Sequence, residues 1–132
     1  MFTLQQIKAA HAKVKTGADF PAYVKEIKDL GLQYYEFFVS DGRAVYHGDD
    51  DFTITGPSIY QEKKIAADAS PESVRQIISE HQQGKSGFLT FCELVARAGV
   101  EKWVVDGQTM LCSYYNLQGN TMVAEPIPDR GY

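Results

Sequence analysis

The sequence predicts an α+β fold of two similar halves, each a pair of helices followed by an antiparallel β-meander. Three observations predict it: apolar residues at helical spacing in four segments, aromatic and β-branched runs after each helix pair, and a match between the two halves of the chain. We expect a single domain over residues 1–132, with an internal repeat covering approximately residues 1–55 and 70–128.

The first helix pair is indicated by apolar faces and by end signals. Thr3 and Gln6 fit a capping box at the start of the first helix, and Gly31 suits the left-handed position after the second. Between these signals the positions facing one side are Leu4, Ile7, His11 and Val14, then Phe20, Tyr23, Val24, Ile27 and Leu30.

The second helix pair repeats this pattern. Ser70 is a cap residue before the first-turn Pro71, and Gly99 closes the last helix. The apolar-facing positions are Val74, Ile77, Ile78 and His81, then Phe88, Phe91, Cys92, Val95 and Ala98.

The two halves can be aligned position by position. An offset of 70 in the numbering, which carries Leu4 onto Val74, matches the first helices and pairs His11 with His81. An offset of 68 matches the second helices and first strands: Phe20, Tyr23, Val24, Ile27, Gly31, Tyr35 and Phe37 with Phe88, Phe91, Cys92, Val95, Gly99, Trp103 and Val105. We therefore expect the halves to superpose, with Gly31 over Gly99 and Tyr35 over Trp103.

Each half continues as strands separated by tight turns. Asp41-Gly42 and Asp106-Gly107 are hairpin signals, and third strands are expected at Phe52–Thr55 and Thr121–Glu125. The intervening segment Gly56–Ala69 has no counterpart. It is either a connection or an additional strand around Lys63–Ala67, and we favour the strand.

Composition excludes several classes of protein. Lys and Arg number 13 against 17 Asp and Glu, a net charge of -4, which argues against nucleic-acid binding. A membrane span needs about 20 consecutive apolar residues, and the longest run is far shorter. The start of the chain does not resemble a signal peptide, so a cytoplasmic location with both cysteines reduced is expected. We expect no cofactor.

Metal and nucleophile candidates are weak. His47, Asp49 and Asp51 belong to the densest group of possible metal ligands, but the spacing of a calcium loop is absent and an acidic turn accounts for them. Cys92 and Cys112 fit small core residues, and a Cys-His pair would need a neighbour that spacing alone does not supply. We therefore expect no metal site and no catalytic residue.

The ligand-binding candidates are His11, His81, Tyr35 and Trp103. The two histidines lie on the buried-facing stripe of their helices, in the last turn, where the helix dipole favours an imidazolium. Either each packs at the edge of the core, or the two face each other across the junction of the halves and share a metal, an anion or a proton. Aromatic runs must place rings on both faces of the sheet, so one face either exposes them or is covered by a partner, a loop or a ligand.

Three segments carry a resemblance: Tyr34–Gly42, Phe88–Cys92 and Gly99–Asp106. The chain resembles, over nearly its whole length, a family of short bacterial proteins of unknown function, sometimes encoded in prophage regions and labelled "phage envelope protein". The resemblance implies a compact bacterial cytosolic domain and brings no established activity, ligand or catalytic residue.

Two functions follow from these observations. The first is a non-enzymatic binding or protein-interaction module, acting on a protein partner or on a second copy of itself as a homodimer. The alternative is a small-molecule binder or minor enzyme with a pocket between the two halves.

Overall fold

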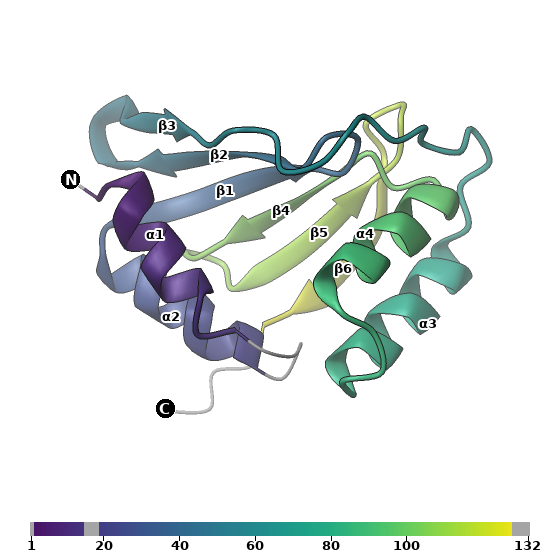
Figure 1. Ribbon diagram of the computed structural model, residues 1–132, viewed down its shortest axis with the longest axis horizontal. Helices are drawn as coiled ribbons and strands as arrows, with labels where there is room; N and C mark the ends of the chain where they lie inside the picture. The colour runs from purple at the N-terminus through teal and green to yellow at the C-terminus, as the bar shows by residue number, and fades with distance from the viewer. Residues whose placement is uncertain (1, 15–18, 128–132) are drawn as a thin grey trace.

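A computed structural model describes residues 2–14 and 19–127, and within them two helices and three strands occur twice in succession (Figure 1). The elements are α1 (Leu4–His11), α2 (Phe20–Asp29), β1 (Leu32–Phe38), β2 (Arg43–Gly48), the short 3-10 helix η2 (Asp49–Asp51), β3 (Thr53–Thr55), α3 (Pro71–Gln82), α4 (Phe88–Arg97), β4 (Lys102–Asp106), β5 (Leu111–Tyr115) and β6 (Thr121–Pro126). The predicted α+β class and order of elements are confirmed.

The predicted helix ends are present in the structure. The Thr3 hydroxyl accepts a hydrogen bond from the Gln6 backbone N–H, and the Gln6 side chain accepts one from the Thr3 backbone N–H. At the start of α3 the Ser70 hydroxyl accepts a hydrogen bond from the Ser73 backbone N–H. Gly31 and Gly99 follow α2 and α4 with φ of +107° and +95°, a conformation that favours glycine.

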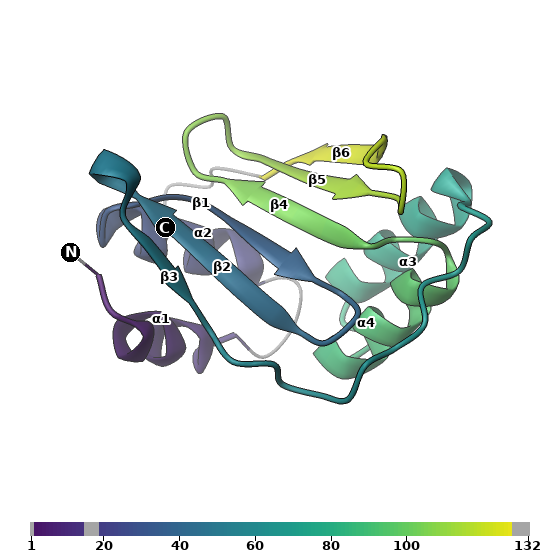
Figure 2. The ribbon, with the colours of Figure 1, turned by 90° about the horizontal axis from the view of Figure 1, so that it is seen from above.

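All six strands form one antiparallel sheet in the order β3-β2-β1-β4-β5-β6. The strands β1 and β4 pair at the centre, so each half of the chain supplies one half of the sheet (Figure 2). Both helix pairs lie on the same face of the sheet, α1 and α2 under one end, α3 and α4 under the other (Figure 1). The hydrophobic core therefore lies between this face of the sheet and the helices.

The pairing at the sheet centre suits the predicted offset of 68 between the halves. Tyr35 lies opposite Val105, and Phe37 lies opposite Trp103. Adding 68 to Tyr35 gives Trp103 and adding 68 to Phe37 gives Val105, so exchanging the halves turns one pair into the other. This register is what an approximate twofold rotation between the halves requires. Superposition of the complete halves stays a prediction.

Two backbone hydrogen bonds beside the central strands obey the same rule. The Val39 N–H donates to the Glu101 carbonyl, and the Gly107 N–H donates to the Gln33 carbonyl, at 2.9 and 2.8 Å. Adding 68 to Val39 gives Gly107, and adding 68 to Gln33 gives Glu101. The two bonds are therefore exchanged by the same rotation.

The hairpin turns are longer than the Asp-Gly signals indicate. Four residues separate β1 from β2, and four separate β4 from β5. The left-handed residue is the last of each connection, Gly42 with φ +74° and Met110 with φ +56°. Gly107 instead lies close to the Gln33 carbonyl, where a Cβ atom would crowd that oxygen. The second Asp-Gly pair therefore marks the turn but not its left-handed position.

The expected strand at Lys63–Ala67 is wrong. Residues 56–69 cross from β3 to α3 without regular structure (Figure 2). The N–H groups of Lys63 and Ala66 donate to the carbonyls of Ser40 and Ala96, which lie in a turn and in α4. Because these acceptors do not belong to one strand, no ladder forms.

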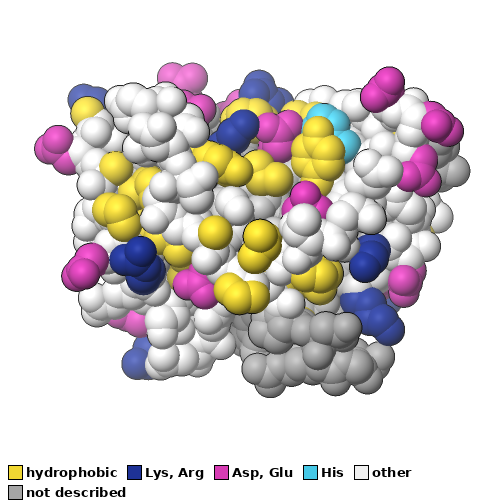
Figure 3. All heavy atoms as spheres, turned by 180° about the vertical axis from the view of Figure 1, so that it is seen from behind, with side chains coloured by type: hydrophobic (Ala, Val, Ile, Leu, Met, Phe, Trp, Pro, Cys, Tyr) yellow, Lys and Arg dark blue, Asp and Glu magenta, His cyan; other side chains and the backbone are white. Residues whose placement is uncertain are grey.

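The outer face of the sheet is covered by side chains of the sheet itself. Tyr34 stacks on His47 with ring centroids 4.2 Å apart. The Glu36 carboxylate accepts hydrogen bonds from His47 Nε2 at 3.0 Å and from Lys102 Nζ at 2.9 Å. The guanidinium of Arg43 lies over the Phe38 ring at 4.6 Å. In the view from behind, Figure 3 shows hydrophobic side chains interspersed with charged ones.

Candidate functional site

A cavity of about 970 Å³ lies between the inner face of the sheet and the two helix pairs. Both halves of the chain line it. From the first half come Leu4, Ile7, Lys8, His11, Ala12, Val14, Phe20, Pro21, Tyr23, Tyr35, Phe37, Gly42, Ala44, Tyr46, Gly56, Pro57 and Ile59, and from the second Ile78, His81, Gln82, Phe88, Phe91, Trp103, Cys112, Tyr114, Glu125, Pro126 and Ile127. The walls are mainly apolar and aromatic, with a few polar groups.

Strand alternation explains which aromatic rings reach the cavity. In β1, Tyr35 and Phe37 point to the helix side, whereas Tyr34 and Phe38 point outward. Trp103 lies opposite Phe37 in the sheet, and their rings stack with centroids 4.3 Å apart. The cavity floor at the centre of the sheet is therefore built from one strand of each half.

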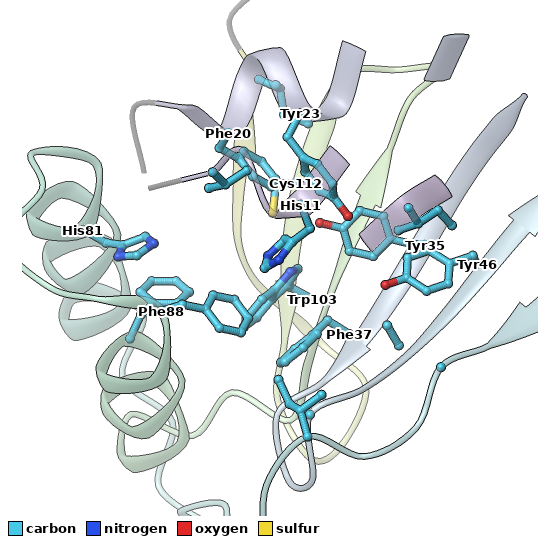
Figure 4. A pocket seen from close by; sticks show the side chains of 18 of the residues that line it. His11, Phe20, Tyr23, Tyr35, Phe37, Tyr46, His81, Phe88, Trp103 and Cys112 are labelled. Atoms are coloured by element: carbon cyan, nitrogen blue, oxygen red, sulfur yellow. The ribbon is translucent and has the colours of Figure 1, made fainter. Parts of the chain in front are cut away.

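Ring contacts join the two helix pairs across the cavity. Phe88 of α4 contacts both His11 of α1, at 5.7 Å between centroids, and Phe37 at 5.5 Å. His11 also contacts Tyr23 of α2 at 5.4 Å. Figure 4 shows these rings around a common space, with His81 approaching from α3. The cavity wall is thus continuous from one helix pair to the other.

All four ligand-binding candidates from the sequence line this cavity: His11, His81, Tyr35 and Trp103. Tyr35 and Trp103 are buried, His81 is half-buried, and His11 is exposed where the cavity opens. His11 and His81 lie on different helix pairs (Figure 4). Whether they act as a pair stays a prediction.

Burial is the largest influence on the pKa of both histidines. Partial removal from water lowers the pKa of His11 and of His81, so both rings are neutral at pH 7. His81 Nδ1 lies 2.9 Å from the Ser86 carbonyl oxygen, which only accepts, so Nδ1 carries the proton. Nε2 is then an acceptor, and it has no hydrogen-bond partner among the described residues.

Three tyrosine hydroxyls are directed toward one region of the cavity: those of Tyr23, Tyr35 and Tyr46 (Figure 4). Burial raises the pKa of all three, and the neighbouring phenols raise those of Tyr23 and Tyr35 further, so each keeps its proton. None of the three hydroxyls has a hydrogen-bond partner within residues 2–14 and 19–127. Within the same residues every fully buried polar side-chain atom has a partner, so these hydroxyls are not fully buried. The hydroxyls therefore face accessible space, as free donors and acceptors for a ligand.

The cavity also contains Cys112 and Glu125, which lie opposite each other in β5 and β6. Burial, together with the charge of Glu125, raises the pKa of the Cys112 thiol to about 12 despite a hydrogen bond with Tyr114, so it is a poor nucleophile at neutral pH. Burial likewise raises the pKa of Cys92 to about 11. A Cys-His nucleophile gains no support from these values.

The metal candidates make other contacts. His47 Nε2 is bonded to Glu36, and Asp49 Oδ1 accepts a 2.6 Å hydrogen bond from the Gln33 amide. Asp51 lies in the 3-10 turn with φ +62°. Among residues 2–14 and 19–127 no three His, Cys, Asp or Glu side chains are grouped as metal ligands.

Several lining residues were not among the sequence candidates: Tyr23, Tyr46, Phe88 and Glu125. For Glu125 a signal was available, since it follows Val123 by two residues in a predicted strand and must share its face. The tyrosines offered no such signal, because their grouping depends on how α2 crosses the sheet.

Comparison with known proteins places this chain in a family. Residues 8–126 match the model of the family described as "Protein of unknown function (DUF1398)". The chain belongs to this family. It is also 24% identical over 117 residues to "Uncharacterized protein YcgX" of Escherichia coli (strain K12), covering 87% of this chain and 86% of that protein. The DUF1398 match begins inside α1 and covers α2, α3, α4 and Glu125, and so most of the cavity wall. The predicted family is confirmed, whereas nothing here supports the prophage label.

One further finding concerns membranes. No helix in the described part of the chain is long and apolar enough to cross a bilayer.

Proposed function

We propose that the protein binds a small, mainly apolar molecule in the cavity between its helix pairs and its sheet. The observation that carries this proposal is the cavity itself. Its volume of about 970 Å³ is that of a ligand site, since such sites span roughly 300–1,000 Å³. Hydroxyls that have no partner among the described residues, gathered at one region of an aromatic wall, are typical of a site that orients a ligand by a few hydrogen bonds.

The predicted protein-interaction module has less support. The large hydrophobic side chains that are exposed among the described residues come from four separate segments: Ile59, Leu89, Leu111 and Leu117. Rings on the outer sheet face are paired with charged neighbours, as with Arg43 and Phe38. A protein partner or a homodimer stays a prediction, which light scattering of the purified protein tests.

Calorimetric titration with 1-naphthol tests the proposal, because this probe combines a flat apolar body with one hydroxyl. Ala12 lines the cavity and is exposed at its mouth, so Ala12→Phe places a ring in the opening. Ala9 lies in α1, three residues before Ala12, is exposed and does not line the cavity, so Ala9→Phe is the matched control. We expect Ala12→Phe to weaken binding about tenfold or more, equivalent to about 1.4 kcal/mol, and Ala9→Phe to leave it within about twofold. No heat of binding at millimolar probe, or equal effects of the two variants, contradicts the proposal.

A further inference from the structure

Glu125 is a carboxylate on an otherwise uncharged inner sheet face. It lies opposite Cys112 in the β5–β6 pair, and residues directly opposite each other share a face of the sheet. Cys112 is buried on the helix side, so Glu125 points to that side as well, and it lines the cavity. It is half-buried, at the edge of the aromatic wall.

The carboxylate has no ion-pair partner among the described residues. Burial raises the pKa of Cys112 and Tyr114, and the negative charge of Glu125 raises both further, so Glu125 acts on the groups beside it on the inner face. A half-buried charge without a counter-ion has lost part of its hydration, and a cation beside it restores the lost interaction.

The remaining lining groups do not oppose a cation at neutral pH. His11 and His81 are neutral there because burial lowers their pKa values. Lys8, the other charged residue of the wall, is exposed on α1, where water screens its ammonium group.

The aromatic wall is itself suited to a cation. Phe37, Phe88, Phe91 and Trp103 form a continuous set of rings, with Trp103 in contact with the other three at 4.3 to 6.2 Å between centroids. Aromatic faces carry partial negative charge and attract ammonium-type cations, Trp most strongly. One carboxylate and several aromatic rings line the same cavity, and these are the recognition elements of a hydrophobic cation.

We infer that the ligand of this cavity is a hydrophobic organic cation, with an aromatic or aliphatic body and one ammonium-type charge beside Glu125. The inference rests on the proposed function and specifies its ligand class. The cationic centre lies against the Glu125 side of the cavity, and the apolar body lies on Phe88 and Trp103.

Three probes of nearly the same shape separate the effect of ligand charge on binding from the effect of ligand shape. They are the cationic N-methylquinolinium, the uncharged 1-methylnaphthalene and the anionic 1-naphthoate. Calorimetric titration of the full chain at neutral pH and low salt gives the three dissociation constants. We expect N-methylquinolinium to bind at least about tenfold more tightly than 1-methylnaphthalene, and 1-naphthoate to bind most weakly.

Glu125→Gln keeps the size of the side chain and removes its charge. We expect it to weaken N-methylquinolinium binding about tenfold and to leave 1-methylnaphthalene binding within about twofold. Glu62→Gln makes the same change of net charge at an exposed residue outside the cavity and serves as the control. Circular dichroism of each variant verifies that it is folded.

The outcomes distinguish the two proposals. If all three probes bind equally and Glu125→Gln changes none of them, the cation inference is wrong and the binding function stands. If none of the probes binds at concentrations up to the solubility of each, the proposed function fails and the inference fails with it. Equal weakening by Glu125→Gln and Glu62→Gln also overturns the role of Glu125.

Discussion

Gly42 and Met110 hold equivalent places in the two hairpins beside the sheet centre. Each is the last residue of a four-residue connection, each has a positive φ, and each donates its N–H to the last residue of the preceding strand, Phe38 or Asp106. Adding 68 to Gly42 again gives Met110. One half satisfies the left-handed position with glycine and the other accepts a methionine there, which costs about 1–2 kcal/mol in backbone strain.

Gly42→Ala should destabilise the protein by about 2–4 kcal/mol. Part of this loss of stability is the cost of a side chain at positive φ. The rest comes from collision of the new Cβ with Ile59 and with the Tyr60 ring, 2.9 Å away. The Tyr60 ring cannot easily retreat, because its hydroxyl donates a 2.6 Å hydrogen bond to the Val39 carbonyl. Urea unfolding measures the loss.

Gly119→Ala is the control for Gly42→Ala. Gly119 also has a positive φ, +82°, but nothing lies within 4 Å of its would-be Cβ. We expect a loss of only about 1 kcal/mol. Equal losses for the two variants would show that the contact with the 56–69 segment is not as described.

Glu36→Gln should destabilise the protein by about 1 kcal/mol at pH 7. Burial alone would raise the pKa of Glu36, but hydrogen bonds from Lys102 and His47 and their charges outweigh it and lower the pKa. A lowered folded pKa gives stability that is present above the unfolded value of 4.5 and is lost as pH falls through the folded pKa. The difference between Glu36→Gln and wild type in urea should therefore shrink toward about pH 3. A difference that does not change with pH would argue against the ion pairs.

The two cavity histidines should make stability fall on mild acidification. Their folded pKa values lie below the unfolded 6.5, so the unfolded chain binds protons first. The stability that the two neutral histidines contribute is fully present above pH 6.5. It is lost as the pH falls from there through their lowered folded pKa values. The urea midpoint should drop between about pH 7.5 and pH 5. In the double variant His11→Gln, His81→Gln the drop should be smaller, and an unchanged drop would assign it to other groups.

Neither cysteine should react quickly with a thiol reagent in the native protein. Both are buried, with pKa values raised to about 11 for Cys92 and about 12 for Cys112 by burial. With a chromogenic disulfide reagent at about pH 8, we expect labelling slower than that of the urea-unfolded chain by a factor of about 100 or more. Rapid labelling of one thiol in the native state would indicate an activated cysteine and reopen the question of nucleophilic chemistry.

The sequence predicted the fold better than the site. Helical spacing and the Thr3 and Ser70 caps are local signals, and the structure contains each of them. The offset of 68 comes from comparing the two halves, and the register of β1 and β4 is consistent with it. The 56–69 segment was misjudged because its hydrogen bonds go to distant loops and helices, which no local pattern encodes.

For the site, the four candidate residues line one cavity, but the reason for choosing them was incomplete. His11 and His81 occupy matching positions in the two halves, on the buried-facing stripe of their helices. The sequence could not show that aromatic rings such as Phe88 lie between the two helix pairs and line the cavity with them. The sequence predicts that one face of the sheet exposes its aromatic rings or is covered by a partner, a loop or a ligand. In the structure the rings of the outer face contact other side chains of the sheet, and the cavity lies on the opposite, helix-covered face.

Occupation of the cavity is tested most directly by two-dimensional ¹H–¹⁵N NMR of the labelled protein titrated with 1-naphthol. The chain has a single tryptophan, so one indole signal reports on Trp103 at the cavity floor. The account predicts that this signal and the amides of Tyr35 and Phe88 shift along one saturating curve, while those of Phe38 and Tyr115 on the outer face do not move. An indole signal that stays in place at saturating probe, or shifts that are largest on the outer face, would contradict it.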